Sequence, residues 1–522
     1  MVTKRPVALA CTSGTALYNY APAIAEAYYQ KIPLIVITAD RPAQWIDQDD
    51  SQTLHQFEAL GKIVKRSYDI YAETGMTTPC ANKDYGSERE WYVNRIANEA
   101  MITATCGRRG PVHINMQFAE PLNRTVDLPE HDELGQETVP GTRIVEVITN
   151  DVGLPPQKSK EIALRLLDKK VMVIAGFMPA DDNLNRAIVE LSKLPNVTIL
   201  CETISNIHMD GHVHMLDSLL KRLTDDEKER LKPDVVISIG GALVSRMLKE
   251  YLRDAEGTEH WTLADTDVSV DCMQRLTTHI EVSPARFFKG LAGMTRHIIR
   301  KGATPKFGNY RNEWLDIKEK CYRLDMAELS DVSWSELKAL AIVFDKIPAS
   351  ANLFLSNGTC IRYAQLLIDR IPHACYCNRG VSGIDGTNAT AYGAAVAYKG
   401  MTVLVTGDMS FAYCPEIMNL KDSGADLRIV VVNNAGGGIF RFIRTTRDLE
   451  QREEYFCSDP KIPIRPLSEA YGWNYCQASS PDELEKAMDF LLSNRNTLVE
   501  IKVDPEKSAG TLISWLNPKH AL

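Results

Sequence analysis

The chain has 522 residues, 44% of them hydrophobic and 24% charged, which is the composition of an ordinary globular protein and a length that predicts about three domains. The net charge of −9 argues against general nucleic-acid binding, because nucleic-acid phosphates repel a negative protein. No apolar run reaches the roughly 18 residues that a membrane helix needs, and the first residues do not read as a signal peptide, so we expect a cytoplasmic protein with no membrane partner.

Residues 1–122 alternate short apolar runs with amphipathic segments, which is typical of an α/β unit. We predict, in chain order, strand 6–11, helix 14–30, strand 33–39, helix 88–105 and strand 111–116. The first of these strands follows almost directly on the first residue, with no earlier strand and helix to pair with it. We therefore expect that an N-terminal segment of this unit is absent from the sequence.

Residues 123–158 are polar and contain four prolines, so we predict a linker there. A central α/β domain at 159–300 follows, then a charged connection at 301–333 and a third α/β domain at 334–522. The central domain is predicted to contain strands 171–176, 197–201 and 235–241 and helices 184–194 and 245–253. The expected architecture is three doubly wound parallel-sheet α/β domains in series.

The third domain contains two apolar runs that read as buried parallel strands. Val403–Thr406 and Leu427–Val432 are rich in Val and Ile, and the segment between them reads as a turn at 407–408 followed by a helix through Ile417 and Leu420. In such a βαβ unit both strands end at the same edge of the sheet, and α/β folds bind ligands at that edge. The residues that follow the two strands are therefore the candidates for a site.

Those residues offer oxygen atoms and bare backbone. Asp408 supplies a carboxylate, Asn434 supplies an amide oxygen, and a run of glycines follows the asparagine. Oxygen ligands without Cys or His suit Mg²⁺, which takes carboxylates together with substrate phosphates, and a glycine loop beside a helix N-terminus admits a diphosphate. Taken alone, each half reads as an ordinary turn or flexible loop. Together, 26 residues apart and each after a buried strand, they indicate a Mg-diphosphate site.

This arrangement resembles the thiamin diphosphate (ThDP) motif, which begins with GD and ends with NN. The resemblance implies that Mg²⁺, or Mn²⁺, is bound by the side chains of Asp408 and Asn434 and by the carbonyl of Gly436. It also implies that the cofactor contacts Gly407, Met409, Ser410 and Gly437. Met409 stands where the usual motif has a third glycine.

A more specific resemblance lies in six runs, TSGTA (12–16), PLIVITADRP (33–42), PVHINMQFAEPL (111–122), CNRGVSGIDG (377–386), TGDMS (406–410) and VVNNAGGGIF (431–440). They are similar to the menaquinone-pathway ThDP family of 2-succinyl-5-enolpyruvyl-6-hydroxy-3-cyclohexene-1-carboxylate synthases. The resemblance implies that residues 1–122 bind the pyrimidine of ThDP and that residues 334–522 bind its diphosphate and the metal ion.

The resemblance also implies a reaction. 2-Oxoglutarate loses CO₂ on ThDP, and the resulting carbanion equivalent adds to isochorismate to give 2-succinyl-5-enolpyruvyl-6-hydroxy-3-cyclohexene-1-carboxylate. A homodimer or homotetramer is expected, because family members place ThDP between subunits. The alternatives are another ThDP-dependent 2-oxoacid decarboxylase or carboligase, and an inactive ThDP-binding subunit.

Each of the two substrates carries two carboxylates, and arginine is the side chain that binds carboxylates at two points without losing its charge. The resemblance assigns substrate binding to Arg41, Arg362, Arg379 and Arg246, although each of them taken alone reads as a surface or ion-pair arginine. The same resemblance places Phe440 beside the substrate.

Two further residues are matched to the reacting centre. Gln52 matches a family glutamine near the reacting carbon. Ile384, which follows Gly383, matches the bulky residue that holds the cofactor bent, so that the amine of the pyrimidine lies next to the thiazolium carbon. Both are therefore candidate catalytic residues, and Gly383 is a candidate cofactor contact.

The family activates ThDP with a glutamate of its first domain. The resemblance places this glutamate a little upstream of the strand that precedes TSGTA, and we expect it to lie in the absent segment. No residue of this sequence is therefore assigned as the activating acid. Comparing the turnover of this chain with that of a chain extended upstream tests the expectation.

Overall fold

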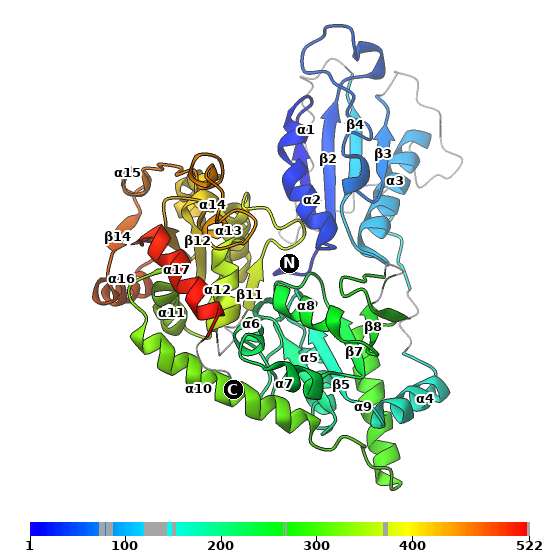
Figure 1. Cartoon of the computed structure of the whole chain (residues 1–522). Coiled ribbons are helices and arrows are strands. Elements are labelled where there is room, and N and C mark those ends of the chain that lie inside the picture. The colour runs from blue at the N-terminus through cyan, green and yellow to red at the C-terminus, as the bar shows by residue number, and fades with distance from the viewer. Residues whose placement is uncertain are drawn as a thin grey trace. The chain divides into compact units, whose positions relative to one another are not determined.

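The computed structural model describes residues 1–72, 79, 87–119, 143–148, 153–264, 266, 269–368 and 374–518, with the backbone alone for 421–423. Residues 4–150 form one compact unit, and residues 1–3 with 151–522 form the other (Figure 1). Most of the expected linker at 123–158 lies outside the described residues. Within the part of the chain that is described, no helix has the length and apolar character needed to cross a membrane.

The unit of residues 4–150 contains a parallel sheet of four strands in the order β1-β2-β4-β3. Its strands are β1 (Val7–Cys11), β2 (Leu34–Asp40), β3 (Ser67–Ile70) and β4 (Val112–Gln117), and its helices are α1 (Ala16–Asn19), α2 (Ala21–Tyr29) and α3 (Glu88–Thr105). The predicted helix 14–30 is thus two helices. Pro22 falls in the first turn of α2, where the missing N–H costs nothing.

The second unit begins with a parallel sheet of five strands in the order β6-β5-β7-β8-β9. The strands are β5 (Val171–Ala175), β6 (Val197–Cys201), β7 (Val235–Ile239), β8 (Glu259–Ala264) and β9 (Leu276–Glu281). The helices are α4 (Pro156–Leu167), α5 (Asp182–Leu191), α6 (Leu216–Leu220), α7 (Asp225–Leu231), α8 (Arg246–Asp254) and α9 (Pro284–Arg300). A long helix, α10 (Tyr310–Asp331), occupies most of the charged segment 301–333.

The last sheet has six parallel strands in the order β11-β10-β12-β13-β15-β14. The strands are β10 (Asn352–Leu355), β11 (Ala374–Cys377), β12 (Thr402–Gly407), β13 (Leu427–Asn433), β14 (Asn474–Ala478) and β15 (Thr497–Lys502). The helices are α11 (Glu336–Lys346), α12 (Thr359–Leu367), α13 (Thr387–Tyr398), α14 (Asp408–Ala412), α15 (Ile464–Ala470), α16 (Pro481–Ser493) and α17 (Pro505–Leu516). All three described sheets are parallel, which confirms the α/β class.

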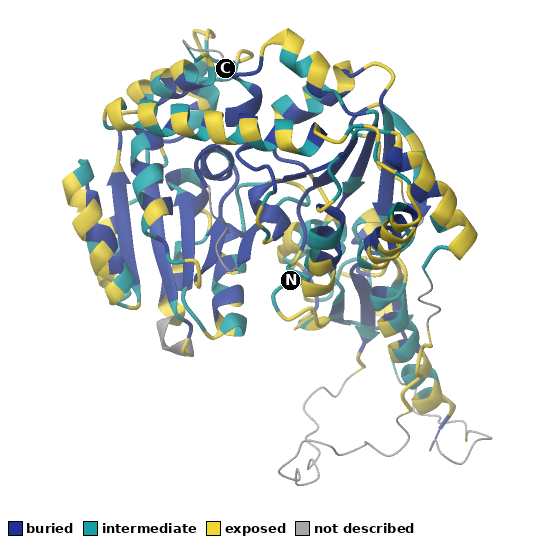
Figure 2. Cartoon of the chain, turned by 90° about the horizontal axis from the view of Figure 1, so that it is seen from below, coloured by how far each residue is buried: buried dark blue, intermediate teal, exposed yellow. Residues whose placement is uncertain are grey.

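The core of the last sheet lies on both faces of its central strands. The strand residues of β12 and β13 are almost entirely buried, as expected for a parallel sheet covered by helices on both sides. Figure 2 shows the strands of the sheets largely as buried, while the helices around them carry exposed outer faces. Because the strands are pinned by this packing, the residues at their carboxyl ends are held in fixed positions.

The order of the strands changes direction between β10 and β12. The chain runs from β10 outward to β11 and then returns across β10 to β12. At such a reversal, α/β folds bind ligands in a crevice outside the carboxyl ends of the strands. The segment after β12 differs from the prediction. α14 begins at Asp408 directly after the strand, and the expected helix through Ile417 and Leu420 is a 3₁₀ segment, Pro415–Ser423, that is distorted at Leu420.

Candidate active site

The first contact at this crevice joins two strand ends. Ser356 follows β10, and its hydroxyl oxygen accepts a hydrogen bond of 3.2 Å from the backbone N–H of Gly407 at the end of β12. β12 in turn pairs with β13 along its full length, up to the pairing of Gly407 with Val432. The polar residues after β10, β12 and β13 therefore lie together at one edge.

Asp408 connects the GD loop with the glycine loop. Its Oδ1 accepts a hydrogen bond of 2.7 Å from the backbone of Met409, and its Oδ2 accepts one of 2.8 Å from the backbone of Gly436. The side chain is buried, and burial raises the pKa of its carboxyl group. A divalent cation beside this carboxylate would stabilise the charge that burial disfavours.

The segment that contains Phe456 and Ser458 packs against the glycine loop. Gly436 and Gly437 have φ angles of +78° and +59°, which other residues rarely adopt. A Cβ atom on Gly436 would lie 2.1 Å from the carbonyl oxygen of Ser458, and one on Gly437 would lie 2.5 Å from that of Phe456. These glycines are therefore required by both the backbone conformation and the segment packed on them.

Asn434 is held by Glu336, a residue that was not predicted to belong to the site. Asn434 Nδ2 donates a hydrogen bond of 3.2 Å to Oε2 of Glu336, the first residue of α11. The other oxygen of Glu336 accepts a hydrogen bond from the Thr359 hydroxyl. The pKa of Glu336 is raised to about 7, chiefly by burial and in smaller part by the nearby Asp408 carboxylate.

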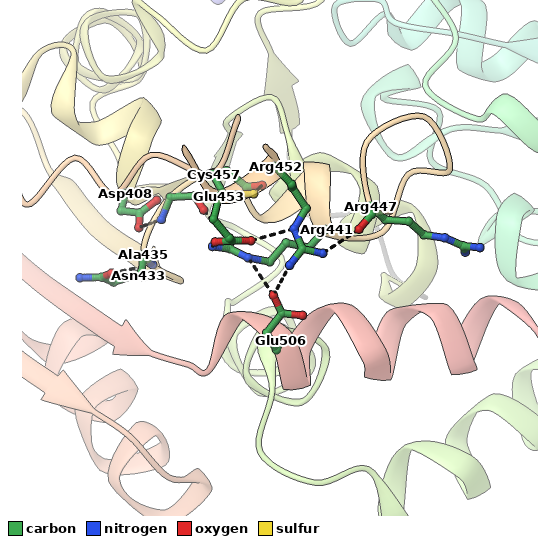
Figure 3. Close-up of polar contacts among 11 residues, drawn as sticks. Asp408, Asn433, Ala435, Arg441, Arg447, Arg452, Glu453, Cys457 and Glu506 are labelled. Carbon is green, nitrogen blue, oxygen red and sulfur yellow. Dashed lines mark hydrogen bonds and ion pairs between the residues drawn. The ribbon is translucent and has the colours of Figure 1, made fainter. Parts of the chain in front are cut away.

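Arg441 is a second supporting residue that was missed. Its Nη1 donates a hydrogen bond of 2.7 Å to the carbonyl oxygen of Gly436, and its Nη2 donates one of 2.7 Å to Glu453. Its Nε also lies 3.5 Å from Glu506 of α17. Figure 3 shows this buried guanidinium between the two glutamates, beside the loop that carries Ala435. The loop is thereby tied to the C-terminal helix.

Ile384 and Gly383 are held at the same crevice. The Ser410 hydroxyl donates a hydrogen bond of 2.5 Å to the carbonyl oxygen of Ile384. Asn357, just after β10, donates one of 2.7 Å from Nδ2 to the carbonyl oxygen of Gly383. Asn357 was not predicted, although its place after a buried strand is the signal that identified Asp408.

Asn357 also positions one of the candidate arginines. Arg379 Nη1 donates a hydrogen bond of 2.9 Å to Asn357 Oδ1. Arg362 is half-buried, and its pKa is lowered first by burial and then by the positive charge of Arg379. Arg246 lowers this pKa as well, whereas Asp217 raises it. The structure thus brings three of the four predicted arginines into one electrostatic neighbourhood.

The outer part of this group is more exposed. Arg246 begins α8, and its Nε forms an exposed ion pair of 2.7 Å with Glu250. Phe440 lies in the short 3₁₀ turn after the glycine loop, with its ring centroid 5.5 Å from that of Phe456. Phe440 therefore packs on the segment that covers the glycines.

Arg41 and Gln52 belong to the unit of residues 4–150. Arg41 follows β2 and forms an ion pair of 2.9 Å with Asp50. Gln52 has a φ of +55°, and a Cβ atom on Gly14 would lie 3.5 Å from the Gln52 backbone. The loop 43–56 is therefore folded closely against the turn that contains TSGTA.

A buried polar network that was not predicted fixes this loop. Gln56 Oε1 accepts a hydrogen bond of 2.6 Å from the backbone of Gly14, and Gln56 Nε2 donates one of 3.1 Å to Asn115 Oδ1. Asn115 Nδ2 then donates to Asp40 Oδ2 at 2.8 Å and to Asp69 Oδ1 at 2.9 Å. The network joins the carboxyl ends of β2, β3 and β4 to the loop.

The donor atoms after β12 and β13 fit a hard divalent cation. Asp408 offers a carboxylate and Asn434 an amide oxygen, and the hydrogen bond between Asp408 and Gly436 holds the two loops together. The Gly436 carbonyl oxygen accepts from Arg441 and has a second lone pair for a metal ion. Oxygen ligands of this kind suit Mg²⁺ and Mn²⁺ rather than softer metals.

Comparison with known proteins agrees with this geometry. Residues 1–59 match the family model "Thiamine pyrophosphate enzyme, N-terminal TPP binding domain", and residues 357–501 match "Thiamine pyrophosphate enzyme, C-terminal TPP binding domain". Thiamine pyrophosphate is another name for ThDP.

Curated relatives match along nearly the whole chain. A 2-succinyl-5-enolpyruvyl-6-hydroxy-3-cyclohexene-1-carboxylate synthase of Porphyromonas gingivalis is 37% identical over 98% of this chain and 85% of its own length. Proteins of the same name from Cytophaga hutchinsonii and Flavobacterium psychrophilum are 33% and 31% identical over 97% of this chain, covering 86% and 85% of their own lengths. The chain therefore belongs to the 2-succinyl-5-enolpyruvyl-6-hydroxy-3-cyclohexene-1-carboxylate synthase family of ThDP enzymes.

Proposed function

We propose that this chain catalyses the ThDP-dependent decarboxylation of 2-oxoglutarate and the transfer of the remaining unit to isochorismate, forming 2-succinyl-5-enolpyruvyl-6-hydroxy-3-cyclohexene-1-carboxylate in menaquinone biosynthesis. The observation that carries the proposal is the closure of the GD loop on the NN-glycine loop, through the hydrogen bond between Asp408 and Gly436, in a chain of this family.

Mg²⁺ or Mn²⁺ would be held by Asp408, Asn434 and Gly436, with the diphosphate beside Gly437 and the start of α14. ThDP, when bound, would supply a nucleophilic carbon that adds to the 2-oxo group and a thiazolium ring that takes up the electron pair left when CO₂ departs. The chain's own contribution is to orient the cofactor. Ile384 is suited to support it because its carbonyl is fixed by Ser410.

The arginines would bind the carboxylates of the two substrates. The positive charges of Arg379 and Arg246 lower the pKa of Arg362. An anionic substrate would reduce the repulsion among these three charges. Arg379 is oriented by Asn357, so its position is set before a substrate arrives. From the unit of residues 4–150 we assign Arg41 to substrate binding and Gln52 to the reacting centre, and Phe440 would line the substrate site.

The proposal also includes a homodimer or homotetramer that acts in the cytoplasm. The eleven described cysteines are all free thiols, which agrees with a reducing compartment. Sedimentation of the active protein tests the oligomer, and a stable active monomer would contradict it.

The experiment that tests the reaction is an assay of CO₂ release with ThDP and Mg²⁺. We expect CO₂ from 2-oxoglutarate and little from pyruvate, with the rate increased by isochorismate and the predicted product formed in equal amount. Release from pyruvate alone would indicate a different 2-oxoacid decarboxylase. Tight binding of ThDP without turnover of any of these substrates would indicate an inactive cofactor-binding subunit.

A further inference from the structure

Two buried glutamates hold Asn433, the last residue of β13, and Asn434, which follows it. Asn433 Nδ2 donates a hydrogen bond of 2.7 Å to Glu500 Oε1, and Asn434 Nδ2 donates one of 3.2 Å to Glu336 Oε2. Glu336 exposes 2% of its surface and Glu500 exposes 4%. Burying a carboxylate is costly unless it is hydrogen-bonded, so each of these glutamates must have a structural or functional reason to be there.

Glu500 has a structural reason. It lies on β15 beside β13, and besides Asn433 it accepts a hydrogen bond from the Tyr475 hydroxyl. These contacts join three neighbouring strands. Asn433 Oδ1 then accepts a hydrogen bond of 3.2 Å from the Ala435 backbone, which shapes the loop without contributing a predicted metal ligand.

Glu336 is different because its partner is the predicted metal ligand itself. It is held in place from two other helices, since its backbone N–H donates 3.0 Å to Ser508 Oγ of α17 and its Oε1 accepts from Thr359 of α12. A Cβ atom on Gly438 would lie 2.4 Å from Asn434 Nδ2, so the NH₂ end of the amide is enclosed.

This enclosure determines which end of the amide is available. The ionised form of Glu336 only accepts hydrogen bonds, so Asn434 presents its NH₂ group to that carboxylate and turns Oδ1 away from it. A divalent metal ion binds the oxygen of an amide. Without a fixed acceptor, the amide could turn its NH₂ group toward the ion instead.

We propose that Glu336 is a positioning residue for the divalent metal: it fixes the Asn434 amide with its oxygen available to the ion and places a negative charge behind that ligand. The inference depends on the proposed metal-diphosphate site. Residues that orient metal ligands in this way commonly change metal affinity by roughly 10- to 100-fold when they are replaced.

The test is a titration of the full chain with Mn²⁺ in the presence of ThDP, with free Mn²⁺ followed by electron paramagnetic resonance. We expect Glu336→Leu to raise the dissociation constant of Mn²⁺ about 10- to 100-fold with the number of sites unchanged. The dissociation constant of Glu336→Gln should lie between those of Glu336→Leu and wild type, because the glutamine keeps an acceptor oxygen but loses the charge. Glu500→Gln is the matched control, because it alters the buried pair of Glu500 with Asn433, the residue next to Asn434. Its dissociation constant for Mn²⁺ should stay within about twofold of the wild-type value.

If Glu336→Leu fails to fold, a double-mutant cycle at Asn434 and Glu336 still tests the inference. It exchanges the hydrogen-bond donor and acceptor between the two side chains. Asn434→Asp places a second carboxylate against Glu336, and adding Glu336→Gln gives the new Asp an NH₂ partner. We expect Glu336→Gln to weaken Mn²⁺ binding in the wild-type background and to strengthen it about tenfold in the Asn434→Asp background. This change of sign requires direct coupling between the two side chains.

Additive effects in this cycle, or wild-type affinity in Glu336→Leu, would overturn the inference while leaving the proposed function intact. Failure of the wild-type chain to bind Mn²⁺ with ThDP would instead overturn the metal site on which the proposed function rests.

Discussion

The backbone N–H of Gly436 donates a hydrogen bond of 2.8 Å to Oδ2 of Asp408, across 28 residues of sequence. This bond joins the loop after β12 to the loop after β13, the two segments that the sequence marks as halves of one cofactor site. The contact also explains why a change in either loop is expected to disturb both.

Asp408→Asn should abolish most metal-dependent cofactor binding. The amide keeps the shape of the carboxylate but loses its charge, and its NH₂ group would face a backbone N–H of Met409 or Gly436. We expect the affinity for ThDP in Mg²⁺ to fall roughly 100-fold or more, measured by isothermal titration calorimetry. The control is Asp489→Asn, which alters an exposed ion pair with Lys346. Unchanged ThDP affinity in Asp408→Asn would contradict the metal assignment.

Gly436→Ala should destabilise the last domain. The new methyl group would lie 2.1 Å from the Ser458 carbonyl oxygen at a φ of +78°, so we expect a loss of about 3 kcal/mol in the free energy of unfolding. Gly393→Ala is the matched control. Gly393 lies within α13 and has nothing within 4 Å of an added Cβ atom, so this change should stabilise by about 0.5–1 kcal/mol. Thermal unfolding of both variants should give shifts of opposite sign.

Arg362→Met should reduce activity and increase stability. It removes a half-buried positive charge whose pKa is lowered overall, first by burial and then by Arg379, in spite of the attraction of Asp217, so the melting temperature should rise. The same change removes a proposed carboxylate contact, and we expect kcat/KM to fall roughly 10- to 100-fold, because a hydrogen bond to a charged group contributes about 1.5–3 kcal/mol.

The control is Arg323→Met on α10, an exposed arginine paired with Glu319. It should leave both quantities near their wild-type values. An Arg362→Met variant with wild-type KM for 2-oxoglutarate and isochorismate would show that this arginine does not bind substrate.

Asp325→Asn should unfold the second unit at much lower temperature. Asp325 Oδ1 accepts hydrogen bonds of 2.7 and 3.0 Å from Arg222 and lies 3.2 Å from Lys221 Nζ, with all three side chains buried. Removing its charge leaves Glu328, whose Oε2 lies 2.7 Å from Arg222 Nη2, as the carboxylate that balances the two buried cations, at a cost of about 3 kcal/mol. Glu319→Gln, on the exposed side of the same helix, should cost less than about 0.5 kcal/mol. Equal effects in denaturant titration would be inconsistent with this account.

Acid should destabilise the unit of residues 4–150 through His113. Burial lowers the pKa of His113 to about 4 from its ordinary value of 6.5, so between these values the unfolded chain binds the extra proton. The stabilisation is complete above pH 6.5 and is lost as the pH falls to about 4, up to about 3 kcal/mol. His113→Gln does not titrate and can still bond Thr38, whose hydroxyl lies 2.8 Å from the histidine ring. Calorimetry from pH 7 to 4 should show a smaller decline for the variant, and parallel curves would contradict the prediction.

The sequence predicts the site best where a polar residue ends a buried strand. Asp408 and Asn434 are of this kind, because apolar runs of Val and Ile define β12 and β13 and parallel strands end at a common edge. Asn357, after β10, carries the same signal. Glu336 does not, since it begins a helix and reaches Asn434 across 98 residues of sequence, a contact that only the folded sheet creates.

Some helix ends and strands could also be predicted from the sequence, and others could not. A helix cap depends on neighbouring residues alone and can be recognised in the sequence, as at the start of α16, where the Glu483 backbone donates to the Ser480 hydroxyl. Strands β8, β10, β11, β14 and β15 were not predicted, and β3 and β9 were missed as well. A physical reason is evident for β3 and β9. Their residues are only partly buried and include polar side chains, so they lack the apolar pattern by which the inner strands are identified.

The ion pair between Arg441 and Glu506 has a consequence for how the protein is made. The ribosome releases the glycine loop well before α17, so a nascent chain holds the Arg441 guanidinium without one of its two carboxylate neighbours. The proposed ThDP site is therefore expected to form only late in synthesis, when the helix that carries Glu506 has docked.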